Sequence, residues 1–412
     1  MAHSHRAVPD GDVEIGGRVR TVLLAVLALV ALATVAGVVA LWPDHAAVDR
    51  VRAGAPYAAP GVTTPNAEVL SVGPACPADT SGTRPPAGCD TLQVRVLEGA
   101  GKGERADVQV PPEVSTSGIG GGDHVELFRT PGKNGEPASY TFSSVRRSAP
   151  LLWLTLLFVA IVILVAGRRG AMAVVGLVVS GATLYYFLLP ALLSGRPGLA
   201  VACVSASAIM FVVLYTTHGF SLRTSTALAG TLVGIGLTAL IGTFVIGGAH
   251  LTGIADESGG ALSSFAGSTL DFQGLLACGM VLAGLGVLND VTITQASSVW
   301  ELRAAAPQAG RRQLFTSAMR IGRDHIASTI YTIVFAYAGA ALVALMLLYV
   351  YDRPLLDLVS TESLAEEVVR TFTSAIGLIL AVPVTTAIAT LIAGPQRVPD
   401  GDDETSTTRP AD

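Results

Sequence analysis

The sequence predicts a helical membrane protein with about eight transmembrane helices and a small β-rich domain between the first two. Three observations lead to this class. The chain is 51% hydrophobic and only 14% charged, whereas soluble domains carry roughly 25% charged residues. Apolar runs of about 20 residues recur, which is the length that crosses the ~30 Å of hydrocarbon in a bilayer. One long polar segment, after the first apolar run, alternates as β-strands do.

The apolar runs place the transmembrane helices in order along the chain. The 150–167 run is short for a span, and a start one turn earlier fits it equally well. The cytoplasmic end of the 273–294 run is ambiguous, because a polar motif follows without a break. We expect helices at residues 21–41, 150–167, 171–190, 199–217, 224–247, 273–294, 327–350 and 369–393.

The first run, 21–41, is interpreted as an uncleaved anchor. It is longer than the apolar core of a signal peptide, and its end, "ALWPD", lacks the small-residue pattern of a cleavage site. Arginines are concentrated in the short loops that lie inside if the N-terminus is inside, while the loop at 351–368 is acidic. By the positive-inside rule, we expect a bacterial plasma-membrane protein with both termini in the cytoplasm.

Residues 42–149 are the substantial soluble segment, and we expect them outside the cytoplasm. The part up to about residue 65 is rich in Pro, Ala and Gly and indicates a linker. Five short strands in the remaining part favour a small barrel or sandwich, with an OB-like barrel as the preferred form. The expected strands are 67–72, 91–98, 104–110, 124–129 and 139–145.

Cys76 and Cys89 fall in this outer segment, where an oxidising environment favours a disulfide. A metal site would need more ligands close by, so we expect no metal. The glycine-rich "GIGGGD" at 118–123 lacks the strand-then-helix context of a phosphate loop. No cofactor is expected, and no basic patch with interleaved aromatics indicates nucleic acid.

The division that follows has two polar tails and three ordered parts. Residues 1–20 and 395–412 are expected to be disordered cytoplasmic tails. Between them lie the anchor at 21–41, the extracytoplasmic linker and β-domain at 42–149, and a seven-helix membrane domain at 150–394.

The motif "GVLNDVTITQASSVWELR" (286–303) is the main functional candidate. On a helix, Asp290, Thr294, Ser297 and Glu301 share one stripe, with Asn289 and Trp300 on a second stripe beside it. If Trp300 marks the interface, Asp290 lies about 15 Å deeper. An intramembrane carboxyl faces the bundle interior or water, and one held away from water binds protons more readily. This pattern predicts a proton relay.

The following helix begins with "RDHIASTIYT" (323–332), in which His325, Ser328, Thr329 and Thr332 share a face. The two polar faces could meet across a pair of helices. The alternative is structural: Asp290 caps or hydrogen-bonds a helix end, and the hydroxyls only satisfy backbone carbonyls.

The long motif, together with "AMRIGRDHIASTIYTIVFAYAGAAL" (318–342), resembles the YibE/F family of bacterial multi-span membrane proteins. The resemblance extends over roughly 20–395, including the order of one helix, a β-rich outer domain and a helical block. It implies no settled biochemical activity.

A more distant similarity links "LNDVTIT" and "WELR" to the Asn-Asp segments of SecD/SecF-type export subunits, which are proton-driven. The chain departs from that class in its seven helices after the outer domain and in Ala296 and Ser297, which replace charged residues. This similarity implies proton coupling through Asp290, with Asn289, Thr294 and Thr329 as hydrogen-bonding neighbours.

Three functions are compatible with the sequence. The preferred one is a proton-coupled transporter or export accessory of unknown substrate. The alternative is a non-transporting scaffold whose outer β-domain binds a cell-envelope or membrane protein partner. An intramembrane enzyme is disfavoured, because the sequence has no H-E-x-x-H motif and no second membrane aspartate facing Asp290. The apolar composition predicts the lipid bilayer as a partner. The sequence leaves the oligomeric state open.

Overall fold

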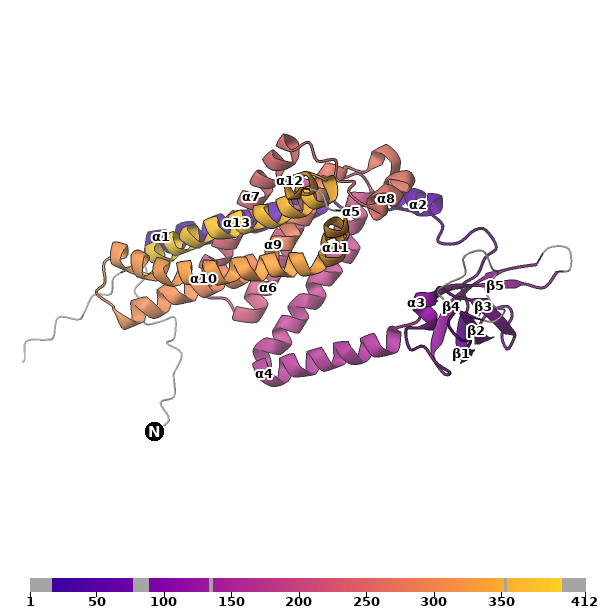
Figure 1. Cartoon of the computed structure of the whole chain (residues 1–412). Helices are drawn as coiled ribbons and strands as arrows, with labels where there is room; N and C mark the ends of the chain where they lie inside the picture. Colours follow the sequence, from indigo (N-terminus) through magenta and orange to yellow (C-terminus); the bar gives the residue numbers. More distant parts are fainter. Residues whose placement is uncertain (1–16, 77–88, 133–135, 352–353, 395–412) are drawn as a thin grey trace, which may run out of the picture. The chain divides into compact units, whose positions relative to one another are not determined.

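The computed structural model describes residues 17–76, 89–132, 136–351 and 354–394 (Figure 1). The chain divides into two compact units. One comprises Ala53–Val165, and the other comprises Met1–Arg52 with Ala166–Asp412. Most of the two tails predicted to be disordered lies outside the described residues, but residues 17–20 already belong to the first helix.

The β-rich unit contains the five predicted strands in one antiparallel sheet. They pair in the order β3-β2-β1-β4-β5, and β3 and β5 lie close together, so the sheet is nearly closed. All five strand predictions are confirmed. The strands are β1 Asn66–Val72, β2 Thr91–Val96, β3 Arg105–Gln109, β4 His124–Thr130 and β5 Ser139–Val145.

Alternation of side chains builds the core of this sheet. In β2, Leu92, Val94 and Val96 are buried while Gln93 and Arg95 face solvent. The inward residues of β1, β3 and β4 join them in a separate hydrophobic core. A five-stranded antiparallel sheet is therefore shown, whereas its assignment as an OB-like barrel stays a prediction.

Cys76 and Cys89 are joined by a disulfide, with their Cα atoms 4.9 Å apart. The two sulfurs and the Asp90 carboxylate also form the one group of potential metal ligands found among the described residues. Because both sulfurs are bonded to each other, this group offers no thiolates to a metal.

The predicted linker between residues 42 and 65 contains a helix, α2 His45–Gly54. The composition that indicated a linker did not reveal this helix. Its central sequence, "HAAVDRVRAG", is rich in the good helix formers Ala and Arg, and Val48 is buried. The prolines that indicated a linker flank this helix and do not interrupt it.

The second unit is built from long helices. The chain enters it through α4, whose backbone is non-helical at Gly167, with φ 58° and ψ −136°. This break separates the predicted 150–167 and 171–190 segments. The long helices are α1 Gly17–Ala40, α4 Ser148–Thr183, α6 Gly198–His218, α7 Leu222–Gly248, α9 Phe272–Ala305, α10 Arg311–Ala340 and α13 Glu362–Ile392.

Shorter helices connect them. A π-helical turn, η2 Leu184–Leu188, and α5 Leu189–Leu193 continue α4. The connections between α7 and α9 and between α10 and α13 contain α8 Glu257–Ala266, the 3-10 turn η3 Gly267–Thr269, α11 Leu342–Val350 and α12 Leu355–Val359.

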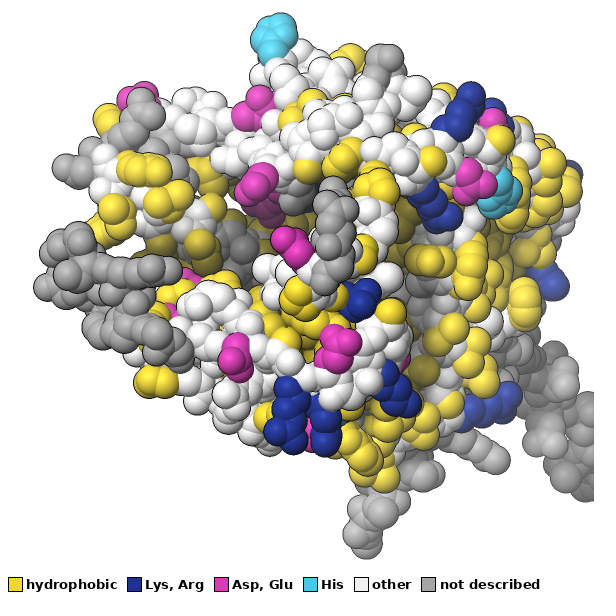
Figure 2. All heavy atoms as spheres, turned by 90° about the vertical axis from the view of Figure 1, so that its right-hand side faces the viewer, with side chains coloured by type: hydrophobic (Ala, Val, Ile, Leu, Met, Phe, Trp, Pro, Cys, Tyr) yellow, Lys and Arg dark blue, Asp and Glu magenta, His cyan; other side chains and the backbone are white. Residues whose placement is uncertain are grey.

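Within the described part of the chain, six helical segments are long and apolar enough to cross a membrane: Arg18–Ala40, Ser148–Leu193, Gly198–His218, Leu222–Gly248, Phe272–Ala305 and Glu362–Ile392. The 46-residue Ser148–Leu193 segment contains the break at Gly167. Many large apolar side chains are exposed, and Figure 2 shows them reaching the surface in broad patches on one face. A bilayer removes such surface from water, so the chain is a membrane protein. The total of eight spans stays a prediction.

Small residues allow the central helices α7, α9 and α13 to approach closely. Gly230 of α7 faces Thr385 of α13, Gly377 of α13 faces Thr238 of α7, and Gly234 packs on Leu288. In lipid, association depends on packing of this kind rather than on the removal of apolar surface from water. The close packing fixes which polar side chains of these helices face each other.

Three helix boundaries differ from the prediction. The 273–294 helix continues to Ala305, the 369–393 helix begins at Glu362, and the 327–350 run is divided into α10 and α11 near Ala341. At Ala305, at Glu362 and at the start of α10, polar residues continue the helix past its apolar run. Hydropathy detects the apolar part of a helix, whereas backbone hydrogen bonding continues wherever the side chains find water or partners.

Candidate functional site

Helix α9 carries polar residues on two different faces. The motif 286–303 forms one continuous helix, as predicted. Thr292, Gln295 and Arg303 are buried among the helices, together with Leu288 and Val299. Asp290 is about 200° around the helix from Thr292, at about 100° per residue, and faces away from this core. The two faces therefore have different surroundings.

The buried face of α9 is tied to its neighbours by hydrogen bonds. The hydroxyls of Thr292 and Thr231 of α7 are 2.7 Å apart. Gln295 Nε2 donates to Thr386 Oγ1 of α13 at 2.8 Å and to the Ala318 carbonyl of α10 at 3.0 Å. One side chain thus links α9 to both α10 and α13.

Arg303 completes the buried face at the C-terminal end of α9. Its side chain is 0% exposed. Nε donates to the Ala393 carbonyl at 3.0 Å, and Nη1 donates to the carbonyls of Pro307 and Ala309 at 3.1 and 2.7 Å. The last carbonyls of a helix have no partner within the helix and need hydrogen-bond donors from elsewhere. Arg303 supplies these donors and so links the end of α13 to the α9–α10 turn.

The other face of α9 meets α10 through Asp290 and His325. Asp290 Oδ2 and His325 Nε2 are 3.9 Å apart, and the Asp290 side chain is 71% exposed. The neighbouring Asn289 Oδ1 is buried with no hydrogen-bond partner among the described residues. The polar faces of α9 and α10 therefore meet at Asp290 and His325, as predicted.

A separate hollow of about 490 Å³ lies further along α9, toward its C-terminal end. Thr294, Ser297, Ser298 and Glu301 line it from α9, and Ile321 lines it from α10. The predicted stripe is therefore a row of polar groups along an open surface groove between two helices.

One expectation about this motif was wrong. Asp290 is not enclosed by the bundle, because the core-facing positions of α9 are those of Leu288, Thr292 and Gln295. Trp300 is buried in the helical core, and its position at the membrane–water interface stays a prediction. Periodicity identified the stripe, but which stripe turns inward depends on the neighbouring helices.

His325 and Thr329 also lie deeper in the helix than expected. Because α10 begins at Arg311, His325 is well inside it and not next to its start. Thr329, one turn further, is buried. The structure gives neither Thr294 nor Thr329 a hydrogen bond to Asp290 among the described residues, so their predicted role as its partners is not seen.

A second polar region lies where the N-terminal ends of α9 and α13 meet α8. A cavity of about 520 Å³ there is lined by Asp256 and Ser258 of the α8 region, Leu275 and Gly279 of α9, and Glu366 and Arg370 of α13, among others. Glu366 is 6% exposed, and its Oε1 has no hydrogen-bond partner among the described residues.

Charged neighbours surround Glu366 without pairing with it. Arg370 Nη1 lies 3.0 Å from Glu367 Oε2, while Arg370 Nε is buried without a hydrogen-bond partner in the described part of the chain. Glu362 accepts from the Thr252 backbone N–H at 2.6 Å. Sequence reasoning placed Glu362, Glu366 and Glu367 in an acidic loop, and so missed this cavity.

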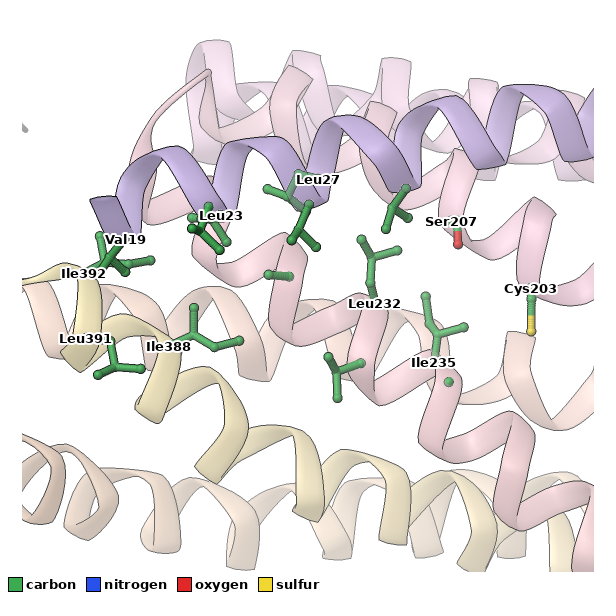
Figure 3. A pocket seen from close by; sticks show the side chains of 16 residues that line it. Val19, Leu23, Leu27, Cys203, Ser207, Leu232, Ile235, Ile388, Leu391 and Ile392 are labelled. Atoms are coloured by element: carbon green, nitrogen blue, oxygen red, sulfur yellow. The ribbon is translucent and has the colours of Figure 1, made fainter. Parts of the chain in front are cut away.

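A third cavity, of about 510 Å³, lies between α1, α6, α7 and α13. Figure 3 shows Val19, Leu23 and Leu27 of α1 facing Leu232, Ile235 and Ile388 across this space. Cys203 and Ser207 are the polar side chains among its described lining residues. Such a lining suits hydrocarbon and not a hydrophilic solute.

Comparison with known proteins agrees with the resemblance of the long motif. The family model described as YibE/F-like protein matches residues 154–395. The chain belongs to the YibE/F-like family. The matched part includes the long helices from α4 to α13, and so both polar regions of the YibE/F-like segment. No curated protein and no solved structure matches the chain.

Sequence reasoning missed the residues that hold the YibE/F-like helices together. Gln295 and Arg303 stand inside the quoted motif, but only their neighbours were singled out. The available signal was spacing: Leu288, Thr292, Gln295 and Val299 recur at three and four residues, as a core-facing stripe does. Polar residues on such a stripe indicate interhelical hydrogen bonds in a membrane protein.

Proposed function

We propose that this YibE/F-like protein is a proton-coupled transporter or export accessory of the bacterial plasma membrane. The Asp290–His325 pair is the single observation that carries the proposal. Two ionisable side chains of opposite type face each other from α9 and α10, next to the hydroxyl groups of Thr294 and Ser328. Ionisable side chains at such depth are costly and mark proton or ion pathways.

The surroundings of the pair support proton exchange. The polar groove from Thr294 to Glu301 lies on α9 between Asp290 and the arginine-bearing end of α9 and α10, which the positive-inside rule places in the cytoplasm. Hydroxyl groups along the groove can order water between Asp290 and that end. In this proposal the proton reaches Asp290 through the groove and His325 is its neighbour on α10. Both termini are proposed to be cytoplasmic, and no enzymatic reaction is assigned.

The proposal is tested with Asp290→Asn, which keeps the shape of the side chain and removes its proton-binding carboxylate. Proton movement is measured with a pH-sensitive dye in vesicles that contain the full chain and carry an imposed pH gradient. We expect the variant to lower the rate at least about tenfold, as loss of a proton-transfer group does.

Asp324→Asn is the matched control, because it removes an exposed carboxylate next to His325 on the same helix. We expect its rate to match that of the original protein. Equal rates for the original protein and the Asp290 variant would refute the relay.

A second function is supported by the β-rich unit. Its five strands enclose a separate hydrophobic core, and a disulfide adds a covalent link within the unit. Such a unit can serve as an outer binding module for a cell-envelope partner while the helices act only as a scaffold. Crosslinking in cells distinguishes the two. A reproducible envelope partner with no proton movement favours the scaffold.

A further inference from the structure

The cavity at the N-terminal ends of α9 and α13 contains a carboxylate that the protein satisfies only in part. Glu366 lines this cavity, is 6% exposed, and leaves Oε1 without a hydrogen-bond partner among the described residues. A buried carboxylate is stable only when a positive charge or hydrogen-bond donors accompany it. A ligand in the cavity can supply both.

The other acidic groups around the cavity are already engaged. Glu367 pairs with Arg370, and Asp256 Oδ1 accepts from the Gly259 N–H at 2.7 Å at the start of α8. The lining acids Asp256, Glu366 and Glu367 outnumber the one lining base, Arg370. The cavity is therefore negative overall, and Glu366 is the carboxylate that remains for a cation.

The arrangement favours an organic ammonium group over a metal ion. Calcium takes six to eight oxygen ligands, commonly from several carboxylates. Within the described residues, no three His, Cys, Asp or Glu ligand atoms gather at this cavity, since the one such group involves Cys76, Cys89 and Asp90. An ammonium needs fewer contacts, and one carboxylate with the hydroxyls of Ser258 or Ser363 can supply them.

The walls of the cavity match the remainder of such a molecule. Leu262, Leu275 and Leu276 provide an apolar side that suits a short alkyl chain. The volume of about 520 Å³ lies within the range of small-molecule sites. We propose that this cavity binds small primary amines, with the ammonium group on Glu366. As the substrate class of the transporter, this assignment rests on the function proposed above.

Binding is measured by isothermal titration calorimetry of the purified full chain in detergent, with n-butylamine as the probe. We expect saturable binding, and we expect 1-butanol and butyrate to bind at least about tenfold more weakly because they lack the ammonium charge. Equal binding of butanol and butylamine would show partition into apolar surface and overturn the proposal. Tighter binding of calcium than of butylamine would identify a metal site and also overturn it.

Glu366→Gln is the decisive variant, because it keeps the size of the side chain and removes its charge. Its Kd for butylamine is expected to rise at least about tenfold. Asp357→Asn removes an exposed acid of α12 that does not line the cavity, and its Kd should not change. An unchanged Kd in the Glu366 variant refutes the site.

Gly279→Val provides a second, steric test if the Glu366 variant fails to fold. A Cβ at Gly279 has room, with Arg370 Nε 3.9 Å away, so a larger side chain enters the cavity without displacing the backbone. This variant should abolish saturable butylamine binding, and retained binding contradicts the assignment.

The Asp290→Asn variant separates this inference from the proposed function. It should lose proton movement and keep butylamine affinity, because Asp290 does not line the cavity. Amine binding without amine-driven proton movement would refute transport and leave the site intact. Proton movement that depends on Asp290, without amine binding, would refute only the site.

Discussion

The two polar faces of α9 contrast in what surrounds them. Thr292, Gln295 and Arg303 are buried and hydrogen-bonded to other helices, whereas Asp290 faces outward with His325 3.9 Å away. Polar groups on the first face satisfy each other and hold the bundle together. Those on the second face include the accessible carboxylate of Asp290 and the imidazole of His325. In a membrane helix, polarity alone does not distinguish a structural residue from a functional one, and the neighbouring helices make the difference.

The largest effect on stability is expected for Arg303→Ala. The substitution removes three hydrogen bonds, to the buried carbonyl of Ala393 and to the partly buried carbonyls of Pro307 and Ala309. We expect a loss of about 3 kcal/mol in the free energy of unfolding. The measurement is thermal or denaturant unfolding in detergent.

Arg320→Ala, which changes an exposed arginine of α10, is the control. It should change the free energy of unfolding by less than about 0.5 kcal/mol. Equal effects would contradict the structural role of the buried face.

An intermediate effect is expected where small residues bring the helices together. A Cβ at Gly230 would overlap Thr385 Oγ1 of α13, whereas a Cβ at Gly236 of the same helix meets nothing within 4 Å. Gly230→Ala should therefore lower the free energy of unfolding by about 1–3 kcal/mol.

Gly236→Ala should leave this free energy unchanged or raise it by up to about 1 kcal/mol, because alanine is the better helix former. Unfolding of the two variants under identical conditions gives the comparison. Similar values would show that α7 and α13 are not in close contact at Gly230.

The smallest effect on stability is expected for Asp290→Asn. Its contact with His325 is long and exposed, and such pairs contribute about 0–1 kcal/mol. The midpoint of thermal unfolding should stay close to that of the original protein, even though proton movement is lost. A loss of stability as large as that of Arg303→Ala would move Asp290 to the structural face and remove the basis for the relay.

Much of the architecture could be predicted from local sequence patterns. The five strands were predicted because Leu92, Val94 and Val96 alternate with polar residues and each strand is bounded by turn-forming residues. Long apolar runs predicted the helices, since lipid leaves few alternatives for a chain of this composition. The helix ends were less accurate, as at Glu362 and Ala305, because polar residues extend the helices beyond the apolar runs.

The candidate site was only partly predictable. The sequence by itself determined the membrane class, the β-rich insertion and the polar stripe that contains Asp290, because composition and periodicity are properties of neighbouring residues. Tertiary structure alone decided that this stripe faces α10 and not the core, that Gln295 and Arg303 join three helices, and that Glu366 lines a cavity with Arg370. These facts depend on how helices far apart in the sequence rotate and pack, and no local pattern specifies that rotation.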